Sequence, residues 1–107
     1  MINANQIRED LRDIKYYYTH KNVFEEAKAE LGESKIMKTV RKYNDIIVSA
    51  PAKFYDLYFS LYMCGHTQES LSEKLCYTRE YIRLINKEFI EYLIKKLNEN
   101  ETKEAKQ

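Results

Sequence analysis

The chain has 107 residues, of which 44% are hydrophobic and 33% charged, and its formal net charge is +1 at pH 7. This length suits one domain with a single core, and the small charge argues against a strong nonspecific DNA binder. With no apolar run of about eighteen residues and no signal-peptide order, we expect a cytoplasmic protein without a membrane span. Two glycines, one proline and no strand pattern predict an all-α fold of about five helices.

Residues 1–50 are predicted to form an N-terminal helical segment that serves packing or dimerisation. Its first helix covers about residues 4–31, with a break near residues 19–22 and a stop at Gly32. The first apolar positions step by four, three and four in a short coiled-coil-like seam: Ile7, Leu11, Ile14 and Tyr18. The apolar face continues in the same helix through Val23, Phe24, Ala27 and Leu31. The seam is either a homodimer interface or the internal packing face.

Two further helices are predicted over residues 34–49 and 51–64. Ser34 begins the first of them, in which four apolar side chains share one face: Ile36, Val40, Tyr43 and Ile47. Pro51 suits the first turn of the second helix.

Three consecutive tyrosines, residues 16–18, lie in the first predicted helix, where their side chains point in different directions around the helix axis. At least one of these rings must therefore leave the core and face water or a partner.

Residues 67–97 contain two amphipathic helical patterns joined by a tight turn. The first helix is predicted over residues 67–75, where Thr67 caps its N-terminus and Leu71 and Leu75 fall on one buried face. A helix of this length is too short to be stable alone, so it must pack against its neighbours.

The second helix is predicted over residues 78–98, with Thr78 as its N-cap after a turn at Cys76 and Tyr77. One continuous buried stripe marks it: Ile82, Ile85, Phe89, Leu93 and Leu97. The opposite side carries residues 79, 80, 83, 84 and 87. Residues 51–98 therefore predict a helix-turn-helix DNA-binding module, followed by a flexible polar tail at residues 99–107.

The run Thr78-Arg79-Glu80-Tyr81-Ile82-Arg83-Leu84-Ile85, with the helix and turn before it, resembles a known family. It is similar to region four of the primary bacterial sigma factors, without a gap over roughly thirty residues. The resemblance implies that Arg79, Glu80 and Arg83 read base edges and phosphates of an upstream promoter box. It also implies that residues 54–65 form the supporting helix. Such proteins would bind double-stranded DNA, with RNA polymerase or a second copy of the chain as a further partner.

The chain departs from this family in several places. Leu84 stands where the family commonly has a polar reader, so an apolar contact to a thymine methyl group would replace one base contact. Cys76 occupies a turn position where helix-turn-helix units often have glycine, so strain or a different turn shape is expected. Residues 1–50 show no sign of the aromatic and basic motif that opens promoter strands. We therefore expect a small regulator of the phage or mobile-element type.

The leading hypothesis is a sequence-specific DNA-binding transcriptional regulator. Its net charge stays a difficulty, because residues 65–97 contain six Lys or Arg against five Asp or Glu. DNA affinity must then come from local placement of charge, from dimerisation or from a partner that also holds the DNA. The predicted DNA-contacting residues are Thr67, Gln68, Thr78, Arg79, Glu80, Arg83, Leu84 and Lys87.

Two alternatives stay open beside this hypothesis. The helix-turn-helix scaffold could instead contact protein or structured RNA, and a phage packaging subunit that recognises DNA is a narrower variant. Catalysis is not expected, because there is no Gly-rich phosphate loop and no nucleophile elbow. No cofactor or metal is expected either, because Cys64, His66 and Cys76 lack the paired spacing of structural zinc sites.

Overall fold

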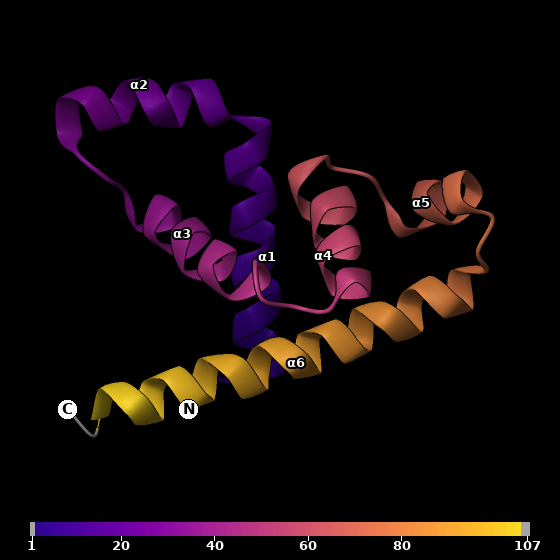
Figure 1. Ribbon diagram of the computed structural model, residues 1–107. Coiled ribbons are helices and arrows are strands. Elements are labelled where there is room, and N and C mark those ends of the chain that lie inside the picture. Colours follow the sequence, from indigo (N-terminus) through magenta and orange to yellow (C-terminus); the bar gives the residue numbers. More distant parts are fainter. Residues whose placement is uncertain (1, 106–107) are drawn as a thin grey trace.

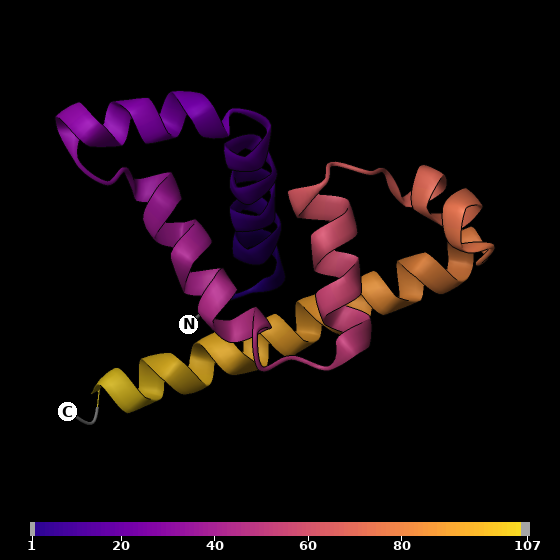
Figure 2. The same ribbon diagram turned by 45° about the horizontal axis from the view of Figure 1, so that its top comes forward.

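The computed structural model describes the backbone of residues 2–105 and the side chains of residues 2–100. Within that range the regular structure is all helical, which confirms the predicted fold class. The elements in order are α1 (Ala4–Thr19), α2 (Lys21–Leu31), α3 (Lys35–Ile47), α4 (Ala52–Tyr58), the π-helical turn η1 (Phe59–Met63), α5 (Gln68–Leu75) and α6 (Arg79–Ala105). Helices α2 and α5 lie at opposite ends of the molecule, with α1, α3 and α4 between them and α6 running along one side (Figures 1 and 2).

Helix α1 lies at the centre of the fold and contacts η1, α3 and α6. The Asn3 side chain caps its start by accepting a hydrogen bond from the Gln6 N–H at 3.0 Å. Its buried side chains are Ile7, Leu11, Ile14 and Tyr17. Tyr17, rather than the predicted Tyr18, is thus the buried tyrosine of this seam. The Tyr16 ring is exposed, as expected for at least one of the three. The seam is an internal packing face.

The prediction that one apolar face continues from the first helix to Leu31 is wrong, because α2 is a separate helix with no buried side chain. The break predicted near residues 19–22 is confirmed, because α1 ends at Thr19 and α2 turns away from the body after His20 (Figure 1). None of the α2 side chains is buried, and Val23 and Leu31 are 64% and 84% exposed. Two α2 side chains reach back to the core at Tyr17: the Phe24 ring centroid lies 5.4 Å from that of Tyr17, and the Glu25 carboxylate accepts a hydrogen bond from the Tyr17 hydroxyl at 2.9 Å.

Helices α3 and α4 complete the inner layer. Ser34 caps α3 as predicted, since its hydroxyl accepts a hydrogen bond from the Met37 N–H at 3.2 Å. The helix predicted over residues 51–64 is divided into α4 and the π-turn η1, which Cys64 closes by donating its N–H to the Phe59 carbonyl at 2.9 Å. This π-helical turn packs against α1.

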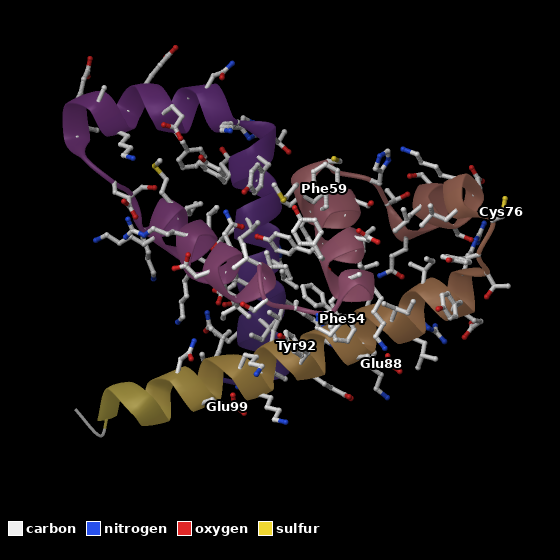
Figure 3. The ribbon with its side chains drawn as sticks, in the orientation of Figure 1. Phe54, Phe59, Cys76, Glu88, Tyr92 and Glu99 are labelled. Carbon is white, nitrogen blue, oxygen red and sulfur yellow. The ribbon has the colours of Figure 1, made fainter. Side chains whose placement is uncertain are left out.

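Helix α6 carries the stripe predicted for it, and all five of its members are buried. Phe89 is at the centre of an aromatic cluster, with ring centroids 5.7 Å from Phe54, 6.1 Å from Tyr58 and 6.4 Å from Tyr62. Figure 3 shows Phe54 and Tyr92 meeting at this place, with their centroids 5.2 Å apart. The predicted helix end near residue 98 is wrong, because α6 continues to Ala105. The last part of the predicted tail, residues 106–107, lies outside the described residues.

Buried tyrosine hydroxyls connect the helices of the core. Tyr43 donates to the Asp10 carboxylate at 2.7 Å, Tyr58 donates to the Asn44 amide oxygen at 3.0 Å, and Tyr62 donates to the Asn86 amide oxygen at 2.9 Å. These bonds join α3 to α1, α4 to α3 and η1 to α6. Each satisfies a polar group that burial would otherwise leave without a partner.

Burial makes the stability of the fold sensitive to alkaline pH. Loss of hydration raises the pKa of Tyr62 to about 12, and burial also raises the pKa of Tyr58 above its ordinary value near 10. The folded chain therefore holds these protons above pH 10, where the unfolded chain releases them. The free energy of unfolding should then fall as pH rises beyond about 10, by about 1.4 kcal/mol per pH unit for each such group.

Urea unfolding between pH 9 and pH 12 measures this slope. A Tyr62→Phe variant should lose stability less steeply with pH than the wild type, whereas Tyr55→Phe, at an exposed position, should keep the wild-type slope. Equal slopes for all three proteins would contradict the assignment of the proton to half-buried Tyr62.

Candidate nucleic-acid interface

Helices α5 and α6 are joined by the short turn at residues 76–78. The Thr67 hydroxyl accepts a hydrogen bond from the Ser70 N–H at 3.0 Å, and the Thr78 hydroxyl accepts one from the Tyr81 N–H at 3.1 Å. Both predicted N-caps are therefore confirmed. They fix where each helix begins, and so fix which α6 side chains occupy its first turns.

The turn depends on an unusual backbone conformation at Cys76. Its φ is +59° and its ψ 27°, and it is the only non-glycine residue with positive φ in the described part of the chain. The turn is closed by Ser72, whose hydroxyl donates to the Tyr77 carbonyl while its own carbonyl accepts the Tyr77 N–H at 3.1 Å. Cys76 thus adopts the left-handed conformation that glycine adopts most easily. Figure 3 places it at the far tip of the molecule.

Helix α5 packs through a narrower face than predicted. Leu71 and Ser72 are buried, but Leu75 is 46% exposed, so the prediction that Leu71 and Leu75 share a buried face is wrong for Leu75. Leu75 lies in the last turn of α5 and lines a groove of about 540 Å³ between α4, α5 and α6. The same groove is lined by the partly exposed rings of Phe59, Tyr77 and Tyr81.

The predicted reading residues are brought together on the exposed side of α6. All five α6 side chains among them are exposed: Arg79, Glu80, Arg83, Leu84 and Lys87. Thr67 and Thr78 are also exposed, whereas Gln68 is half-buried at the start of α5. Arg79 reaches across to α5, where its guanidinium lies 2.6 Å from the Glu69 carboxylate. The two groups of predicted contacts therefore form one continuous surface.

Two ion pairs hold the arginines of this surface. Arg79 pairs with Glu69, and Arg83 pairs with Glu80 at 3.1 Å, with both arginine side chains 72% exposed. Exposed ion pairs contribute about 0–1 kcal/mol, so a phosphate oxygen can replace either carboxylate at small cost. Lys87 has no ion pair among the described side chains. The surface therefore presents three cationic groups to a phosphate: Lys87, which has no such ion pair, and two arginines whose ion pairs cost little to break.

Sequence reasoning missed one residue beside this surface. Arg8 of α1 lines a second groove, of about 470 Å³, together with Glu80, Arg83, Leu84 and Lys87 of α6. Asn86 and Ile90 complete its wall. Nothing in the sequence pairs residue 8 with residues 80–90, because the two segments meet only through the packing of α1 on α6.

The described side chains contain no group of three or more His, Cys, Asp or Glu placed to hold a metal ion. Cys64 and Cys76 are both exposed free thiols. In the described part of the chain, none of the helices has the length and apolar character needed to cross a bilayer.

Comparisons of the chain with protein-family models, with curated proteins and with solved structures found no match. The likeness to sigma region four therefore rests on the residues of the chain alone.

At position 76, glycine should give a more stable protein than alanine. Glycine adopts positive φ without the steric cost of a Cβ atom, so we expect Cys76→Gly to raise the free energy of unfolding by about 0.5–1 kcal/mol over Cys76→Ala. Both variants lack the thiol, so their difference reports the backbone alone. Urea unfolding of the two proteins measures it, and equal stability would contradict a strained turn.

Proposed function

We propose that the protein is a DNA-binding transcriptional regulator that reads duplex DNA with the first turns of α6. The main support for this proposal is the exposed side of α6 over residues 79–87. Directly after a capped turn, this side presents cationic, acidic and apolar side chains. This stretch is about 12 Å long at 1.5 Å per residue, a length that suits a major groove about 12 Å wide.

Each exposed α6 side chain has a chemistry that suits a particular contact. The guanidinium groups of Arg79 and Arg83 can donate to guanine edges or to phosphates, and the Glu80 carboxylate can accept from a cytosine amino group. Leu84 is 53% exposed and can pack against a thymine methyl group. Lys87, one turn further along, would contact the phosphate backbone.

The threonine caps and Gln68 would position the module on the backbone. Each threonine hydroxyl accepts its cap hydrogen bond and still has a proton to donate to a phosphate oxygen. Thr67 and Gln68 lie at the start of α5, where free backbone N–H groups and the helix dipole favour an anion. Thr78 would serve the same purpose at the start of α6.

A further partner would add affinity for DNA, because the small net charge of the chain contributes little. At +1 the whole chain has little long-range attraction for DNA. RNA polymerase, or a second copy of the chain bound to an adjacent half-site, would add contacts without any change to the reading surface.

A second candidate function is a protein-interaction module. It is favoured by the groove between α4, α5 and α6, where Phe59, Leu75 and Tyr81 are each 45–46% exposed. Exposed apolar side chains grouped in this way are typical of protein contact sites. This function does not use the side of α6 that carries Arg79 and Arg83, so mutagenesis separates the two.

The test is selection of random duplex DNA by the wild type and by an Arg79→Ala, Arg83→Ala double variant. The wild type should enrich a motif and the double variant should not, because the variant loses both guanine-reading groups. On the enriched site, Arg83→Ala alone should weaken binding by about 1–3 kcal/mol and relax preference at one base position.

The matched control for this experiment is a Phe59→Ala, Leu75→Ala double variant, which alters the apolar groove and leaves α6 unchanged. It should enrich the wild-type motif. If the wild type itself enriches nothing at moderate salt, autonomous DNA reading is wrong and the protein-interaction module becomes the better account.

A further inference from the structure

Helix α1 brings a cationic side chain to the edge of the proposed reading surface. Arg8 is exposed, and it lines the same groove of about 470 Å³ as Arg83 and Lys87. The effect of Arg8 on Tyr62 also indicates that the guanidinium lies beside α6. The positive charge of Arg8 acts to lower the pKa of Tyr62, against the larger effect of burial, and the Tyr62 hydroxyl is hydrogen-bonded to Asn86 of α6.

The groove between α1 and α6 concentrates positive charge that is absent from the chain as a whole. Its lining contains three cations, from Arg8, Arg83 and Lys87, and a single carboxylate, from Glu80. That carboxylate is paired with Arg83. Among the described side chains, neither Arg8 nor Lys87 forms an ion pair, so two positive charges face the groove without an acidic neighbour in contact.

The backbone that carries Arg8 is held in place by the core. Its neighbours on α1, Ile7 and Leu11, are buried in the core, and α1 packs directly on η1 and α6. The Arg8 Cα is therefore fixed relative to residues 83–87. A guanidinium presented from a fixed helix, beside but not on the reading helix, suits a phosphate group better than a base edge.

We propose that Arg8 binds a phosphate of the DNA backbone next to the site read by α6, so that α1 is a second DNA-contacting helix. This inference rests on the proposed function of α6 and extends the contact surface to the N-terminal segment. Each strand of duplex DNA carries one phosphate per about 3.4 Å of helix axis, so a strand that passes α6 at Lys87 offers further phosphates on the side of α1.

The experiment compares the wild type with Arg8→Gln, Arg8→Lys and a control, Lys38→Gln. Lys38 is an exposed cation on α3, which lies away from the first turns of α6 (Figure 1). Dissociation constants are measured for the selected duplex and for an unrelated duplex across a range of salt concentrations. Circular dichroism confirms that each variant keeps the helical content of the wild type.

Arg8→Gln should weaken binding to both duplexes by the same factor, about three- to tenfold at low salt, and leave the enriched motif unchanged. The slope of log affinity against log salt should become shallower by about 0.9, the value expected for one lost phosphate contact. Arg8→Lys, which keeps the charge, should restore most of that slope. Lys38→Gln should match the wild type.

The failure of this inference is distinguishable from the failure of the proposed function. If Arg8→Gln behaves like Lys38→Gln while Arg83→Ala still loses base preference, α6 reads DNA without α1 and the inference is wrong. If Arg8→Gln weakens only the selected duplex, Arg8 contacts a base and the phosphate assignment is wrong. If the wild type binds neither duplex, both proposals are overturned.

Discussion

The Phe89 ring packs α6 onto α4 and η1 at the centre of the aromatic cluster. Its ring is fully buried between Phe54 and Tyr58 of α4 and Tyr62 of η1. Because α6 is one continuous helix from Arg79 to Ala105, anchoring it at Phe89 also sets which residues of its first turns lie on the side away from the core. Core packing and the presentation of residues 79–87 are therefore consequences of the same contact.

Much of this arrangement follows from local sequence signals. The buried stripe of α6 obeys the helical period, and Thr67, Ser34 and Thr78 are residues whose side chains suit an N-cap. Periodicity assigns side chains to a face of their own helix but does not say which neighbour covers that face. For this reason the spacing did not show that Leu75 of α5 and Val23 and Leu31 of α2 stay exposed.

Sequence reasoning missed the π-turn η1 and the place of Arg8 beside α6. The π-turn η1 adds a residue to one turn of a helix, which no composition signal marks, and it brings Tyr62 against Asn86. Arg8 joins Arg83 and Lys87 only because α1 packs across α6. The exposed α6 residues were predicted from their spacing, whereas the cation that α1 adds beside them became visible only in the fold.

Nuclear magnetic resonance can locate the DNA-binding surface that we propose on the exposed side of α6. Amide spectra of the ¹⁵N-labelled protein are recorded during titration with its selected duplex. We expect the largest shift changes at residues 79–87, at the start of α5 and in the part of α1 around Arg8. Changes centred instead on the groove lined by Phe59, Leu75 and Tyr81, or on α2, would contradict the proposal.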